Sequence, residues 1–126
     1  MKINLLKCVK IFDAIVDVEN EKFDFSTSHA LVTLKRELEP HVQFYTQKEK
    51  EIVARYANRD EKGNIILNGN QFQMPSDKAE LYLSEKNELN SVEVEICFTR
   101  KTISPICNVK PSALELLMEV FDFREV

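Results

Sequence analysis

Residues 59–75 read RDEKGNIILNGNQFQMP, and they place a tight β-hairpin between two segments with helical patterns. Asn68 and Gly69 can supply the two positive-φ positions of a type I′ turn, and the flanking residues give both arms a common apolar face. The members of this face are Ile65, Leu67, Phe72 and Met74. The stretch has no pattern typical of a nucleophile, a metal ligand or a phosphate loop, so it predicts architecture and not chemistry.

The composition is that of one folded domain. The chain has 126 residues, 44% apolar and 30% charged, and this size buries roughly two-thirds of the unfolded surface in a single core. We therefore expect one domain over residues 1–126. A net charge of -4 with interleaved acidic and basic residues argues against a nucleic-acid partner. The absence of a bilayer-length apolar run and of a cleavable signal predicts a cytoplasmic protein without a membrane partner.

Two helices are predicted before the hairpin. The first has an apolar stripe at helical spacing, formed by Leu5, Val9, Phe12 and Val16. The second can be capped by Ser26 or Ser28 and should be the longest element, because its apolar spacing continues to Tyr56. Proline in a helix interior costs about 3 kcal/mol, so Pro40 predicts a kink or a break near Glu39. Two shorter helices are the alternative.

A third helix and a strand are predicted after the hairpin. Asp77 and Glu80 have the spacing of a capping box, which predicts a helix to about Asn90. Strict alternation over about 92–98 is the clearest strand signal, with an apolar face of Val92, Val94, Ile96 and Phe98. An isolated hairpin is only marginally stable, so we expect this strand to join the hairpin (about 64–74) in a small antiparallel sheet. The predicted fold class is α+β, mainly helical, with about four helices.

The last predicted helix begins at Pro111 and is apolar on nearly every side. The residues expected to face inward are Leu114, Leu117, Met118 and Phe121. A helix that is apolar all round has to be covered all round, so Leu116 and Val120 are covered either by the same domain or by a partner chain or second copy. The candidate protein interface consists of Leu116, Leu117, Val120 and Phe121.

No side-chain pattern indicates a metal site or a catalytic site. His29 and His41 have no carboxylate or cysteine at a familiar ligand spacing. Glu93 and Glu95 lie on the same side of the predicted strand, where paired acids can act as general acid and base. They form the polar half of an amphipathic strand, however, which favours a solvated surface.

The chain has three cysteines, Cys8, Cys97 and Cys107, and no two of them form a C-x-x-C pair. An odd number of cysteines cannot all pair in a disulfide framework. We expect reduced and mostly buried thiols that pack as small hydrophobic groups. With only Gly63 and Gly69, the chain lacks a glycine-rich phosphate loop. The sequence therefore predicts a non-enzymatic protein without a metal or other cofactor.

Four segments carry a resemblance to a known family. They are residues 55–57 (RYA), 60–64 (DEKGN), 88–96 (ELNSVEVEI) and 111–115 (PSALE). In these segments, and in the order of its predicted elements, the chain resembles a family of small uncharacterised proteins of tailed phages and prophages. The resemblance implies a virion-associated or assembly-accessory role, because such genes tend to lie among tail and late structural genes. It implies no catalytic residues.

Three functional hypotheses follow. The first is a non-enzymatic phage or prophage protein that contacts a virion component or a second copy of itself, in the bacterial cytoplasm or in the virion. The alternative is a small regulatory or host-interaction module that binds a bacterial protein through its acidic helices. The third, an enzyme that uses Glu93 and Glu95, requires a concave pocket around both residues with raised carboxyl pKa values.

Overall fold

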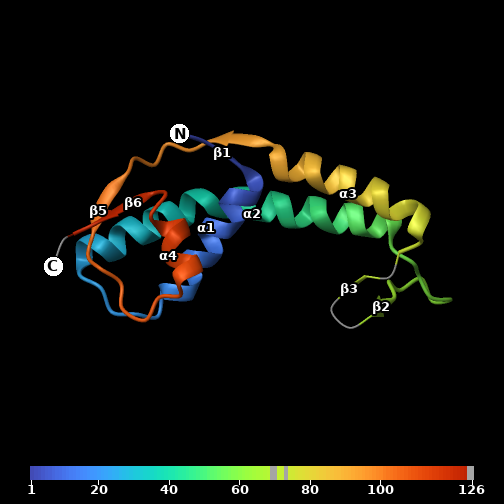
Figure 1. Ribbon diagram of the computed structural model, residues 1–126, viewed down its shortest axis with the longest axis horizontal. Helices are drawn as coiled ribbons and strands as arrows, with labels where there is room; N and C mark the ends of the chain where they lie inside the picture. Colours follow the sequence, from blue (N-terminus) through green and yellow to red (C-terminus); the bar gives the residue numbers. More distant parts are fainter. Residues whose placement is uncertain (69–70, 73, 125–126) are drawn as a thin grey trace.

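The computed structural model has a mainly helical α+β fold, which confirms the predicted fold class (Figure 1). It describes residues 1–68, 71–72 and 74–124. The helices in this part of the chain are α1 (Leu5–Val18), α2 (Phe25–Tyr56), α3 (Ser76–Ser91) and α4 (Pro111–Leu117). The strands are β1 (Lys2–Asn4), β2 (Leu67–Asn68), β3 (Gln71–Phe72), β4 (Glu93–Glu95), β5 (Lys101–Ile103) and β6 (Phe121–Phe123).

The strands form three separate two-stranded sheets within the described residues. β1 pairs with β4 and β2 with β3, both antiparallel, whereas β5 and β6 are parallel. The predicted pairing of the hairpin with the strand at about 92–98 is therefore wrong. The hairpin precedes α3 and the strand follows it, and a helix of 16 residues separates its two ends by about 24 Å. The nearest strand to β4 is instead β1, at the start of α1.

The hairpin itself lies where it was predicted. Leu67 pairs with Phe72 and Asn68 pairs with Gln71, so Asn68 is a strand residue and not the first central residue of the turn. Gly69, the other predicted turn residue, lies outside the described residues, as do the side chains of Leu67 and Phe72 in the predicted apolar face.

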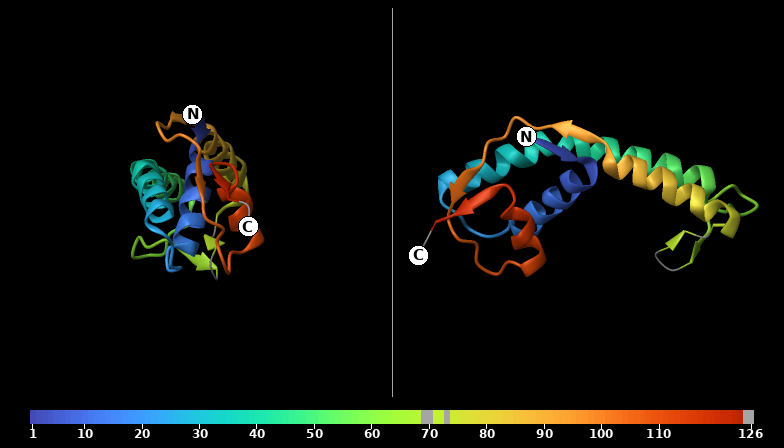
Figure 2. Two further views of the ribbon diagram at one scale, coloured as in Figure 1. Left: turned by 90° about the vertical axis from the view of Figure 1, so that its left-hand side faces the viewer. Right: turned by 45° about the horizontal axis from the view of Figure 1, so that its top comes forward.

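The fold has two parts, which we call the head and the arm (Figures 1 and 2). The head comprises α1, residues 25–39 of α2, α4, and the sheets β1–β4 and β5–β6. The arm comprises residues 41–56 of α2 with α3 beside it, and it carries the β2–β3 hairpin at its far end. None of the helices in the described ranges combines the length and apolar character needed to cross a bilayer.

Helix α1 lies at the centre of the head, in contact with α2, α4 and the end of α3. Its buried residues are Leu5, Cys8, Ile11, Ala14, Ile15 and Val18. The predicted stripe is therefore wrong in its orientation, since Val9 and Phe12 are half-buried and Val16 is exposed. Several elements cover this helix, so its neighbours decide which side meets solvent, and the hydrophobic spacing by itself does not.

Helix α2 is continuous through Pro40. The alternative of two shorter helices is therefore wrong. Figure 1 and the right-hand view of Figure 2 show the helix bending near its middle, as expected of an interior proline. The predicted serine caps are also wrong: the cap is Asp24, whose side chain accepts a hydrogen bond from the Thr27 N–H at 2.8 Å.

Two further helix ends differ from prediction. Helix α3 begins after Pro75 without a side-chain cap, so Asp77 lies in its first turn and does not form a capping box with Glu80. Helix α4 ends at Leu117, and Phe121 lies in β6. Met118, which follows the last residue of the helix, was predicted to face inward and is exposed.

The predicted apolar face of the strand at about 92–98 is largely present. Val94 is half-buried, and Ile96 and Phe98 are buried in the head core. Val92 is exposed, since the chain leaves α3 at this residue. The alternation of the sequence thus continues beyond the hydrogen-bonded strand, which ends at Glu95.

Candidate functional site

The four residues of the predicted interface do not form an exposed surface. Leu117, Val120 and Phe121 are buried in the head core, and Leu116 is half-buried against it. Phe121 packs edge-on to Phe98, with ring centroids 5.4 Å apart. Of the two alternatives for covering this segment, the structure supports cover by the same chain.

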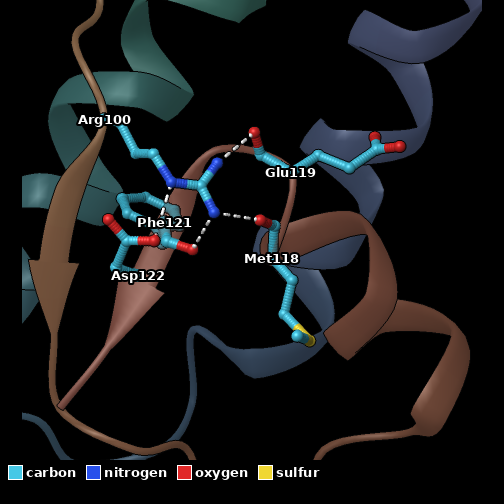
Figure 3. A network of polar contacts seen from close by, with 5 residues as sticks. All are labelled: Arg100, Met118, Glu119, Phe121 and Asp122. Carbon is cyan, nitrogen blue, oxygen red and sulfur yellow. Dashed lines mark hydrogen bonds and ion pairs between the residues drawn. The ribbon is translucent and has the colours of Figure 1, made fainter.

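Arg100 holds this segment in place (Figure 3). Its guanidinium donates to the carbonyls of Met118 at 2.6 Å, Glu119 at 2.8 Å and Phe121 at 3.1 Å, and its Nε donates to the Asp122 carboxylate at 2.8 Å. These three carbonyls follow Leu117, the last residue of α4, and a basic side chain near a helix C-terminus can donate to carbonyls that the helix leaves without partners. No local pattern in the sequence indicates this role, because Arg100 lies 18 residues before Met118.

Glu93 and Glu95 are both exposed side chains at the ends of β4. Glu95 Oε1 accepts a hydrogen bond from the N-terminal amine at 3.0 Å, whereas Glu93 lies at a cavity that Glu95 does not line. The structure therefore does not bring the two carboxylates together in one concave pocket, which the enzyme hypothesis requires.

The two histidines lie far apart on one helix. His29 and His41 are both in α2, and twelve residues of α-helix span about 18 Å. His29 stacks on Phe25, with ring centroids 5.9 Å apart. Within residues 1–68, 71–72 and 74–124, no group of three or more His, Cys, Asp or Glu side chains is placed to hold a metal ion.

The three cysteines are free thiols in different environments. Cys8 is buried in the head core, and burial raises the pKa of its thiol to about 11. Cys97 and Cys107 are exposed, so the prediction of mostly buried thiols is wrong. The sequence neighbours of a cysteine do not reveal burial here, since both exposed thiols lie in the irregular segments on either side of β5.

A cavity of about 470 Å³ lies beside β1 in the head. One wall is formed by Lys2, Ile3 and Asn4, and another by Glu119 and Val120 of the turn before β6. Its volume falls within the range of about 300–1,000 Å³ typical of ligand sites. No sequence motif indicated this cavity, because it forms between the two ends of the chain.

The arm exposes apolar side chains. Only Leu89 is buried among the 16 residues of α3, while Leu81 and Leu83 are 54% and 55% exposed and Phe44 of α2 is 46% exposed. Successive residues lie about 100° apart around a helix axis. Leu81 and Leu83 therefore flank Tyr82, which packs inward, and leave apolar surface on both sides of α3.

Polar contacts join the two helices of the arm. The Tyr45 hydroxyl donates to Asn90 Oδ1 at 2.6 Å, and Lys86 pairs with Glu49 while its Nζ lies 4.7 Å from the centre of the Tyr45 ring. The buried residues of the apolar cluster that the arm shares with α1 are Leu5, Tyr45, Ile52 and Leu89. The arm is thus held by few buried side chains, and its polar contacts supplement them.

The DEKGN segment, residues 60–64, forms a closed turn near the far end of the arm. Asp60 Oδ1 accepts from the N–H groups of Lys62 and Asn64, both at 2.9 Å. Gly63 has a φ of +84°, which a residue without a Cβ adopts most readily. The local structure of this turn therefore accounts for the aspartate at its start and for the glycine within it.

No protein-family model, no curated protein and no solved structure matches this chain. Of the surfaces described above, the arm is the strongest candidate for contact with another protein, because it combines exposed apolar side chains with a small buried core.

Proposed function

We propose that this chain is a non-enzymatic phage or prophage protein with a structural or assembly-accessory role, and that its arm contacts another protein. The observation that carries the proposal is the exposure of apolar side chains on α3. An amphipathic helix normally covers a continuous apolar stripe, yet α3 buries one residue and exposes two leucines. A partner that covered them would remove apolar surface from water, which is favourable by about 25 cal/mol per Å².

The position of the resembling segments also supports the proposal. Residues 55–57 lie at the end of α2, residues 60–64 form the closed turn beyond it, and residues 88–96 run from the end of α3 into β4. Three of the four segments thus lie on the arm or where it joins the head. A contact surface on the arm gives a common reason for the exposed leucines and for these segments.

The experiment is capture of partners from bacteria in which the prophage has been induced. The bait is the full chain, compared with Leu81→Glu/Leu83→Glu. We expect the wild-type chain to retain a phage-encoded structural or assembly protein, and the double variant to lose it, because a charge would be placed in the contact whichever flank of α3 the partner covers. The single variants Leu81→Glu and Leu83→Glu then show which flank of α3 is used.

A matched control is Ser84→Glu/Asn87→Glu, which adds the same charge to exposed polar positions of the same helix. Circular dichroism should show equal helix content in all variants. Capture that is unaffected by Leu81→Glu/Leu83→Glu would refute the arm as the contact surface. Capture of a host protein in place of a phage protein would instead favour the regulatory or host-interaction module.

A further inference from the structure

One edge of β1 is open in the part of the chain that the structure describes. β1 pairs with β4, where the Leu5 N–H donates to the Val92 carbonyl and the Ile96 N–H donates to the Met1 carbonyl, both at 2.8 Å. Residues of an antiparallel strand alternate between bonding toward the partner strand and away from it. The N–H and C=O of Lys2 therefore point away from β4.

This open edge borders a cavity. The cavity of about 470 Å³ is lined by Lys2, Ile3 and Asn4, with Glu119 and Val120 on its far side. No backbone hydrogen bond outside the β1–β4 ladder reaches Lys2 from the described residues. Unpaired N–H and C=O groups at a sheet edge are a template for a further strand, and here the cavity provides room for one.

The side chains of β1 define which strand would fit. On the paired edge, β1 already accepts the sequence Glu-Val-Glu of β4, with Val94 opposite Ile3 and Glu95 opposite Lys2. The Lys2 ammonium makes no ion pair with any described residue.

The acidic group on the far wall of the cavity is already neutralised. The Glu119 carboxylate pairs with Lys7 at 3.0 Å. Glu93 also lines the cavity, but it belongs to β4, opposite Asn4 on the paired edge, so Lys2 is the unpaired charge of β1 itself. Cross-strand neighbours of opposite charge and aliphatic neighbours both stabilise a sheet. The open edge therefore suits an aliphatic residue beside Ile3 and an acidic residue beside Lys2.

We propose that the open edge of β1 and the adjoining cavity bind an extended acidic segment of a partner protein, which adds to β1 as a third strand. Main-chain hydrogen bonds to Lys2 supply affinity, and the alternation of acidic and aliphatic side chains supplies selectivity. The site lies in the head and is separate from the exposed leucines of the arm. It is therefore independent of the proposed role of the arm.

The probe is a fluorescein-labelled peptide, acetyl-VEVEI-amide, which repeats residues 92–96 and is titrated with the full chain by fluorescence anisotropy. Lys2→Pro removes the outward N–H and the charge, and an edge strand tolerates proline where the N–H faces outward. We expect Lys2→Pro to weaken binding by about tenfold or more, because it removes one main-chain hydrogen bond together with the charge of the ammonium group. Lys2→Glu should weaken it by about threefold to tenfold through charge alone.

Two controls distinguish binding at this edge from binding elsewhere on the chain. Lys10→Glu makes the same charge change at an exposed position of α1 outside the cavity, and it should leave binding unchanged. Hydrogen exchange should show that the peptide protects the Lys2 amide and leaves the Leu5 amide as protected as before. Loss of Leu5 protection would mean that the peptide displaces β4, which overturns the proposal.

Three other results also overturn it. These are no binding of the peptide to the wild-type chain, equal binding to wild type and Lys2→Pro, and a doubled mass by light scattering that Lys2→Pro abolishes. In the last case a second copy of the chain, and not a partner segment, occupies the edge.

Discussion

The head and the arm are built from the same helix but stabilised in different ways. In the head, α2 buries Thr27, Ala30, Leu31, Leu34 and Leu38. In the arm, a similar length of the same helix buries Tyr45, Ile52 and Val53. The head half has α1 and the segments after α3 around it, whereas the arm half has α3 as its main neighbour.

The difference shows that the apolar spacing of a helix does not by itself determine how strongly the helix is stabilised. Both halves of α2 follow an apolar spacing of three and four, yet the number of neighbours decides how much apolar surface each half buries. Regions with few buried apolar contacts open at lower free energy than the core. We therefore expect the arm to open before the head, and the following predictions test this ordering.

The largest effect is expected from truncation of the head core. Leu34 is fully buried, and Leu34→Ala should lower the free energy of unfolding by about 2–5 kcal/mol, because it leaves a cavity among rigid neighbours. Ile52→Ala in the arm should cost less, about 1–2 kcal/mol, since a less enclosed site can relax. Urea titrations followed by circular dichroism measure both values, and equal costs would contradict the distinction between head and arm.

The next prediction compares the loss of stability when one arginine is removed from the head and one from the arm. Arg100→Ala removes the donors to three carbonyls after α4 and should cost about 1–3 kcal/mol. Arg55→Ala breaks the pair with Glu85 in the arm, 2.5 Å long, and should cost less, because an exposed ion pair contributes little to stability. The same urea titrations measure both. A larger cost for Arg55→Ala would mean that polar contacts hold the arm more firmly than the turn after α4.

A smaller effect is acid sensitivity of the head. Hydrogen bonds from the Thr27 hydroxyl and N–H and from Ser104 lower the pKa of Asp24 from 3.8 to about 2. A carboxyl with a lowered pKa in the folded state contributes stability above its unfolded pKa, and this contribution is lost as pH falls. The melting temperature should therefore decrease between about pH 4 and pH 2.

Asp24→Asn is the matched variant for the acid effect, since it keeps a capping oxygen without the titrating charge. We expect its melting temperature to depend less on pH over this range than that of the wild type. Identical pH profiles for the two proteins would show that Asp24 is not responsible. Hydrogen exchange in α3 should respond equally to pH in both proteins, because Asp24 is bonded to head residues.

The smallest perturbation is thiol labelling. Burial raises the pKa of Cys8 to about 11, so its thiolate fraction at pH 8 is roughly one in a thousand, and the thiolate is the reactive form. Ellman's reagent should label the exposed Cys97 and Cys107 quickly and Cys8 only after the head opens. At urea concentrations that reduce exchange protection in α3, Cys8 should still be unlabelled. Labelling of Cys8 together with arm opening would mean that the two parts unfold as one unit.

Much of the helical part of the fold could be predicted, because helices follow from local spacing. The hairpin and the alternation of Val94, Ile96 and Phe98 were also readable, since strand periodicity is local. The ends of the elements were harder: Asp24 caps α2 although two serines follow it, and aspartate and serine are both favoured as helix caps. The candidate interface at the C-terminal segment was predicted from its apolar excess, which the head core in fact accounts for.

The sequence by itself determined the fold class, the positions of the helices and the presence of the hairpin, because these depend on residues within one or two turns of each other. The tertiary structure decided which side of α1 is buried and that β4 pairs with β1. It also decided that Phe121 lies in β6 and not in α4, with its carbonyl bound by Arg100. Each of these contacts joins residues far apart in the chain. Local periodicity contains no information about such partners, so only packing in three dimensions could select them.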